Sequence, residues 1–89
     1  MEKSKNELIL DILKNEQIRY LFLVSLISSD NILTIEDAEA NLARIDEVET
    51  AVNAGDLSDE LEKEIRKYIK DGRKILNQDI ESFKNSKSN

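Results

Sequence analysis

Apolar residues recur at helical spacing in the first third of the chain. Ser4 and Glu7 form an S-x-x-E capping box, which predicts that a helix begins near Lys5. The apolar positions that follow this cap match one helical face: Ile9, Ile12, Leu13, Tyr20, Leu23, Val24 and Ile27. A polar stretch at residues 14–17 interrupts the pattern, so the segment forms either one helix or two helices with a break near Asn15.

The second half of this segment, residues 18–27, is apolar on nearly every side because only Arg19 and Ser25 are polar. Such a helix is buried on more than one side, either at the centre of a bundle or within an interface. Residues 20–24 are also rich in strand-forming residues, so a short buried strand is the alternative. No partner strand is visible elsewhere in the sequence, and helix is favoured.

A second helix is predicted from about Ile35 to Asn53. Thr34 with Asp37 gives its N-cap signal, with the aspartate in the place of the usual glutamate. Its apolar seam consists of Ile35, Ala38, Leu42, Ile45 and Val52. Gly55 is expected to follow the helix in a left-handed conformation, which costs glycine little.

A third helix is predicted after Ser58, which is a good N-cap residue. Its apolar face consists of Leu61, Ile65, Tyr68, Ile69, Ile75, Leu76, Ile80 and Phe83. The register continues through Gly72, which favours one long helix that is weakened by about 1 kcal/mol at the glycine. The alternative is a turn at Asp71-Gly72.

These elements predict an all-α fold, an antiparallel helical bundle of three long helices, or of four if the first breaks near Asn15. The chain of 89 residues contains no proline and two glycines, so little interrupts its helices. Its length suits one domain with one modest core. We expect residues 1–84 to form a single helical-bundle domain and residues 85–89 to form a frayed polar tail.

Composition excludes most catalytic chemistry. The chain has no histidine and no cysteine, which removes imidazole bases, thiolate nucleophiles and the metal sites that depend on them. It also has no glycine-rich phosphate loop and no calcium-loop motif. The sequence therefore predicts a protein that is not an enzyme, with no catalytic residues, no metal and no cofactor.

The charge is unevenly distributed, although the whole chain carries −6. Residues 30–58 contain eight acids and a single base, Arg44, whereas residues 59–89 contain seven acids and eight bases. Such a chain has little general attraction for nucleic acid or anionic membranes. No apolar stretch approaches the roughly 20 residues of a membrane span, and Met1–Glu7 lacks a signal-peptide layout. We expect a cytoplasmic protein with no nucleic-acid partner and no membrane span.

A basic stripe on the third predicted helix is the main candidate for a binding surface. It lies opposite the apolar face and consists of Lys63, Arg66, Lys67, Lys70, Arg73 and Lys74. Several of these residues follow one another at i,i+4 spacing and therefore repel one another. Either acids of the second helix (Glu39, Asp46, Glu47) or solvent neutralise the stripe, or an anionic surface of a partner protein does so.

Glu49 occupies a position where the seam of the second helix requires an apolar residue. Either it lies at the edge of the seam while Val48 takes the inward place, or it forms a structural ion pair. In that case its partner is a base such as Arg44 or a base on another helix.

One stretch carries a family resemblance. The run Asn41-Leu42-Ala43-Arg44-Ile45-Asp46 is followed by Val48, Ala51-Val52, Gly55 and Leu57-Ser58 before Leu61. Over about residues 38–70 this pattern is similar to the immunity proteins of pediocin-like (class IIa) bacteriocins. The resemblance implies an antiparallel four-helix bundle in the cytosol that protects a bacteriocin producer by engaging a membrane-embedded sugar transporter together with the toxin, without enzymatic activity.

These observations predict a non-catalytic protein-binding module, in first place an immunity-type protein that shields a target from a bacteriocin. One alternative is a phage-encoded or antitoxin-like inhibitor that binds a host enzyme. Another is a small oligomeric structural or assembly protein, in which oligomerisation buries the apolar helix at residues 18–27. The partner is another protein in each case, and the sequence leaves the oligomeric state open.

Overall fold

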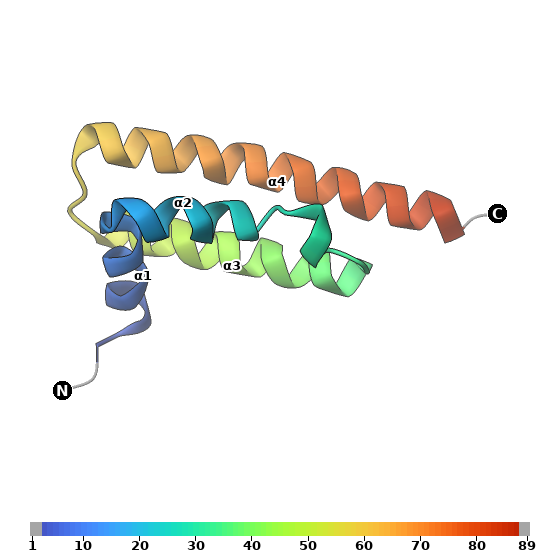
Figure 1. Cartoon of the computed structure of the whole chain (residues 1–89), viewed down its shortest axis with the longest axis horizontal. Helices are drawn as coiled ribbons and strands as arrows, with labels where there is room; N and C mark the ends of the chain where they lie inside the picture. The colour runs from blue at the N-terminus through green and yellow to red at the C-terminus, as the bar shows by residue number, and fades with distance from the viewer. Residues whose placement is uncertain (1–2, 88–89) are drawn as a thin grey trace.

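The computed structural model describes residues 3–87, and all of their regular structure is helical (Figure 1). The elements are α1 (Lys5–Lys14), α2 (Glu16–Ser25), the single 3-10 turn η1 (Ser29–Asn31), α3 (Ile35–Ala54) and α4 (Asp59–Lys87). The predicted all-α bundle is confirmed in its four-helix form, and residues 20–24 are helical.

The first predicted helix breaks at Asn15, whose backbone is extended (φ −90°, ψ 109°). The Asn15 side-chain oxygen accepts hydrogen bonds from the backbone N–H groups of Gln17 and Ile18, both at 3.2 Å, and so caps the start of α2. Arg19 donates to the carbonyl oxygen of Leu13 at 3.0 Å, which satisfies a group at the end of α1. Local hydrogen bonds therefore stabilise the corner between the two helices.

The cap of α3 is the predicted capping box. The Thr34 side chain accepts from the Asp37 N–H at 3.1 Å, and the Asp37 carboxylate accepts from the Thr34 N–H at 3.1 Å. At the other end of α3, the expected left-handed Gly55 is wrong, because this residue is extended with φ −95°. A Cβ atom at this position would lie 2.7 Å from a methyl group of Leu10, so a larger residue would require the Leu10 side chain to shift.

α4 is one uninterrupted helix of 29 residues, which excludes a turn at Asp71-Gly72. Gly72 is buried, and a Cβ atom there would lie 3.0 Å from Ile45 Cδ1 and 3.2 Å from Ile27 Cγ2. The glycine thus allows α4 to approach a side chain of α3 and a side chain of the segment that follows α2. The helix also includes residues 85–87 of the segment expected to be a frayed tail, and residues 88–89 lie outside the described part.

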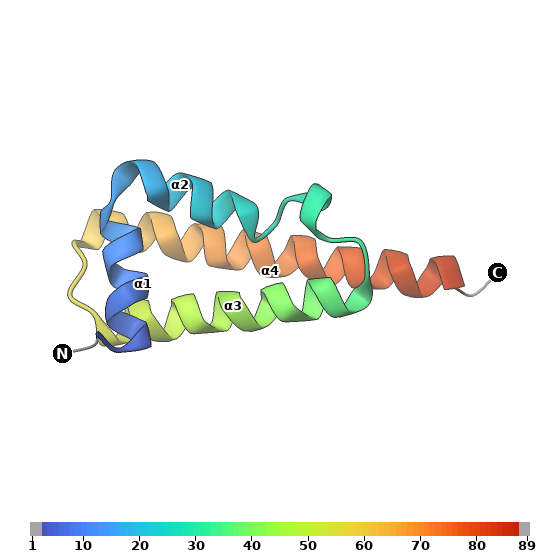
Figure 2. The ribbon, with the colours of Figure 1, turned by 60° about the horizontal axis from the view of Figure 1, so that its bottom comes forward.

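Three helices run along the length of the molecule, and α1 crosses their end (Figures 1 and 2). α3 runs antiparallel to both α2 and α4, and it packs on α4 along its length and on α1 near its C-terminal end. An antiparallel arrangement therefore describes α2, α3 and α4 but not α1. The break at Asn15 allows α1 to turn across the bundle, where Leu13 is completely buried.

The core is aliphatic and draws on all four helices. Its fully buried large side chains are Leu13, Val48, Val52, Ile65 and Leu76. α2 and the two residues that follow it cover the seam between α3 and α4, since Leu23, Leu26 and Ile27 lie against side chains of both helices. The apolar spacing of the second predicted helix put Glu49 at an inward position. In the structure Val48 is the buried residue there, and Glu49 lies at the edge of the core.

The outer side of α2 remains apolar and exposed. Ile18, Tyr20 and Leu21 are 49%, 60% and 69% exposed. The expectation that this helix occupies the centre of the bundle is therefore wrong, because α2 lies on the outside and buries one side only. The alternative expectation, that its apolar surface belongs to an interface, stays a prediction.

Candidate functional site

The six basic residues predicted as one stripe fall into two sets in the structure. Arg66 and Arg73 lie on the flank of α4 that faces α3, where both are partly buried and bonded. The four lysines lie on the outermost line of the helix and are exposed. Seven residues separate the two arginines, which is two helical turns, so the helix period itself puts them on one flank.

Arg73 joins α4 to α3. One of its terminal nitrogens, Nη2, lies 2.7 Å from Asp46 Oδ1 and 2.8 Å from Glu49 Oε1, while Nη1 donates to Glu49 Oε2 at 3.1 Å. The forked guanidinium matches the Glu49 carboxylate with two parallel hydrogen bonds. This hydrogen bonding lowers the pKa of Glu49 from its usual value and raises that of Arg73.

Arg44 and Glu49 are not brought together as an ion pair. Glu49 takes its base from another helix, Arg73 of α4, whereas Arg44 has no ion-pair partner within residues 3–87. The sequence placed Arg73 in the basic stripe and named Asp46 among the acids that could neutralise it, but it did not identify Arg73 as the base that pairs with Glu49. The signal was present, because Asp46 and Glu49 are three residues apart on one side of the second predicted helix.

Arg66 makes a smaller contact of the same kind. Its Nε lies 3.3 Å from Glu62 Oε2 on the preceding turn, and its Nη2 donates to the Asn53 side-chain oxygen on α3 at 2.7 Å. Acids of α3 and α4 therefore neutralise both arginines. The four lysines are exposed, so neutralisation by solvent and contact with a partner protein both stay predictions for them.

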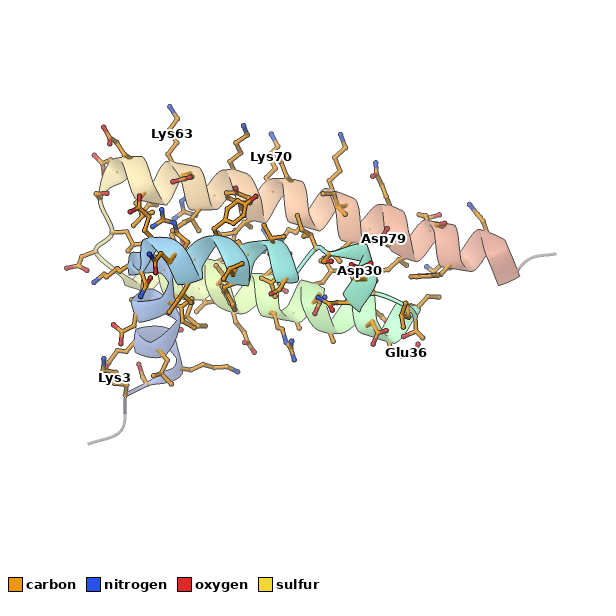
Figure 3. All side chains as sticks on the ribbon, in the orientation of Figure 1. Lys3, Asp30, Glu36, Lys63, Lys70 and Asp79 are labelled. Carbon is orange, nitrogen blue, oxygen red and sulfur yellow. The ribbon has the colours of Figure 1, made fainter. Side chains whose placement is uncertain are left out.

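Lys63, Lys67, Lys70 and Lys74 form a lysine ridge along the outside of α4. Their spacing of four, three and four residues keeps them in line for about 16 Å of helix. Figure 3 shows Lys63 and Lys70 projecting away from the other helices. In the part of the chain that the structure describes, none of the four has an ion-pair or hydrogen-bond partner, whereas Lys5 and Lys14 pair with Glu47 and Asp56.

Exposed acids run beside the lysine ridge on one flank of α4. Glu60, Glu64 and Asp71 are spaced by four and seven residues, so they form a second line parallel to the lysines. A uniformly negative surface such as a membrane or a nucleic-acid backbone would meet these carboxylates together with the lysines. The paired lines suit a protein surface, where acids and bases can alternate to match them.

The remaining chemistry of the described residues is limited. No group of three or more acids is arranged to hold a metal ion in residues 3–87, and the whole chain lacks histidine and cysteine. None of the described helices is both long enough and apolar enough to cross a bilayer. Comparison with protein-family models, curated proteins and solved structures finds no match to this chain.

Proposed function

We propose that this protein is a non-catalytic binding module whose lysine ridge contacts an acidic surface of a partner protein. The observation that carries the proposal is the line of four exposed and unpaired lysines on α4. Lysines without an ion-pair partner gain when an acidic surface neutralises them, and charged lines on both sides of an interface fix its register and speed association. Surface lysines make such contacts without any reactive centre.

Within this class, we propose an immunity-type protein that shields a cytoplasmic target from a bacteriocin. The resemblance of residues 38–70 to pediocin-like immunity proteins supports this role, as does the size of the four-helix chain. The partner would be a membrane transporter in complex with the toxin, reached from the cytoplasmic side.

A protection assay tests both statements. Sensitive indicator cells expressing the protein are challenged with a panel of pediocin-like bacteriocins, and survival is compared with that of cells carrying an empty vector. We expect the wild-type chain to protect against at least one toxin. The double variant Lys67→Glu/Lys70→Glu reverses two charges at the centre of the ridge and should lose protection while its helical circular dichroism is kept.

The control Lys3→Glu/Lys14→Glu changes the net charge by the same amount away from α4. Both side chains are about half exposed, at 54% and 52%, so the substitutions disturb little packing. This control should protect like the wild type. Protection by the ridge variant at the wild-type level would remove the ridge as the contact, and absence of protection by the wild-type chain would refute the immunity role.

A second candidate function is a small oligomeric assembly protein, and the exposed apolar surface of α2 favours it. Ile18 and Leu21 are neighbours at i,i+3 on the outer side of α2. Association of copies through this surface would bury them. Sedimentation velocity at micromolar concentration separates the candidates: an oligomer that Leu21→Glu converts to a monomer supports assembly, and a monomeric wild-type chain contradicts it.

A further inference from the structure

An open groove of ≈ 360 Å³ lies between α1, α2 and α3. Its apolar lining includes Leu8 and Ile12 of α1, which are one helical turn apart, and Phe22 of α2. Leu8 is 52% exposed, and Ile12 and Phe22 are partly buried. The groove therefore presents aliphatic and aromatic surface to solvent on a side of the molecule to which α4 contributes no lining residue.

The charged residues that line this groove do not cancel one another: two are basic and one is acidic. Lys5 and Glu47 pair across its edge at 2.7 Å and compensate each other. Arg44 of α3 is exposed and has no partner within residues 3–87. The other three arginines of the chain all donate hydrogen bonds: Arg19 to Leu13, Arg66 to Glu62 and Asn53, and Arg73 to Asp46 and Glu49. The groove thus carries one uncompensated positive charge.

A second hollow of ≈ 270 Å³ continues the groove towards η1. The two hollows share Ser25, Leu26 and Arg44, so the guanidinium lies between an apolar half and a polar half. Asp37 lines the polar half, where its Oδ2 accepts from the N–H groups of Leu33 and Thr34. No ion pair joins Asp37 to Arg44 within residues 3–87, so the guanidinium can pair with an acidic group that enters from outside.

We propose that this groove is a second docking site, which binds an amphipathic helix of a partner protein through apolar side chains and one carboxylate. The apolar side chains pack on Leu8, Ile12 and Phe22, and the carboxylate pairs with the Arg44 guanidinium. Arginine and aromatic residues beside apolar surface are the residue types that dominate binding energy at protein interfaces. Charge complementarity selects a carboxylate. Lys5 and Glu47 neutralise each other, so the positive charge of Arg44 is the net charge of the residues that line the apolar half.

The shape of the site favours a helix over an extended peptide. An extended peptide gains affinity by adding a strand to a free sheet edge, and residues 3–87 contain no strand. A helix offers apolar side chains at i, i+3, i+4 and i+7, with an acid at the border of that stripe. The lining from Lys5 to Ile12 covers about 10 Å of α1, which matches two turns of a bound helix.

This inference rests on the proposed binding function, but it concerns another surface. The lysine ridge belongs to α4 alone, and the groove belongs to α1, α2 and α3. A module with two separate contact surfaces can hold two partners, or two parts of one partner, at the same time. Substitutions in the groove leave the ridge unchanged, so the two proposals can fail independently.

The test uses the full 15N-labelled chain and synthetic stapled helices as probes. Each 14-residue probe carries leucines at i, i+3, i+4 and i+7 and one glutamate at a varied position on the border of that stripe. A matched set carries lysine in place of glutamate. Titration followed by 15N–1H correlation spectra gives the dissociation constant and identifies the residues whose signals shift.

We expect a glutamate probe to shift signals around Leu8, Phe22 and Arg44 and to leave the lysine ridge unaffected. Arg44→Glu should weaken the glutamate probe about tenfold or more and strengthen the lysine probe, because the charge pair is then exchanged. Leu8→Glu should also weaken binding, whereas Leu33→Glu should not, since Leu33 is 73% exposed and lies outside the groove.

Three results would overturn the proposal. The first is a lack of saturable shifts at millimolar probe concentration, and the second is a set of shifts that map to the lysine ridge. The third is a set of shifts around Leu8 and Arg44 that arise on raising the protein concentration alone, which would make a second copy of the chain the occupant.

Discussion

Asn41 is the buried polar residue among the described side chains, with 8% of its surface exposed. Its side-chain amide donates to the carbonyl oxygen of Leu26 at 3.0 Å. That carbonyl lies at the C-terminal end of α2, where the last carbonyls of a helix lack partners within the helix. Asn41 therefore ties α3 to the end of α2, next to the groove that Leu26 and Arg44 line.

Replacing Asn41 with alanine removes this donor and leaves the Leu26 carbonyl buried without a partner. A buried unsatisfied acceptor costs about 1–3 kcal/mol. For a domain of this size each kcal/mol lowers Tm by about 4–8 °C. We therefore expect Asn41→Ala to lose about 1–3 kcal/mol of unfolding free energy, measured as a lower urea midpoint with an unchanged slope in circular dichroism at 222 nm.

Asn41→Asp provides the matched test, because it has almost the same shape but cannot donate while ionised. At neutral pH it should destabilise the chain more than alanine does, since a buried carboxylate faces a carbonyl oxygen. Burial raises the pKa of the introduced carboxyl, and its protonated form regains a donor. The deficit relative to the wild type should therefore shrink as the pH falls. An alanine variant within about 0.5 kcal/mol of the wild type, or an aspartate deficit independent of pH, would refute the reasoning.

Three further predictions test the packing and the link between helices. Leu13→Ala should cost about 2–5 kcal/mol in urea unfolding, because the completely buried Leu13 joins α1 to the core, and a cost below about 1 kcal/mol would contradict the position of α1. Gly72→Leu should lower Tm because its side chain would collide with Ile45, a result that a turn at Gly72 would not give. Glu49→Gln should destabilise the chain at pH 7, and the deficit should shrink as the pH falls below 4.5. Arg73 lowers the pKa of Glu49 below this usual value, so the stability that Glu49 contributes above pH 4.5 is lost as the pH falls through the lowered pKa. Urea midpoints over a series of pH values measure the effect, and a deficit that does not change with pH would count against the Arg73 contact.

The ends of the helices were predictable because local side chains form them. The capping box of Thr34 and Asp37 and the cap at Ser58 use atoms within three residues of each other, which tertiary packing does not need to bring together. Gly55 shows where such reasoning stops. Its local pattern suggested a left-handed helix end, but the backbone there is extended and Leu10 of a distant helix packs against it.

The candidate site was predictable as a set of residues but not as an arrangement. Helical spacing placed the six basic residues away from the apolar face, and the four lysines of the ridge are exposed there. Periodicity could not show that Arg73 reaches Asp46 and Glu49, because this depends on which flank of α4 faces α3. The groove beside Arg44 was not predictable, since its lining comes from three helices.

By itself the sequence determined that this chain forms capped amphipathic helices and that it lacks histidine and cysteine chemistry. Both follow from residue types and from contacts within one or two helical turns. Only the tertiary structure decided that α1 crosses the bundle, that one side of α2 stays exposed and which cations remain unpaired. These features depend on which faces of helices distant in the chain pack against each other. A helix face that is buried against one neighbour is not available to another neighbour or to solvent.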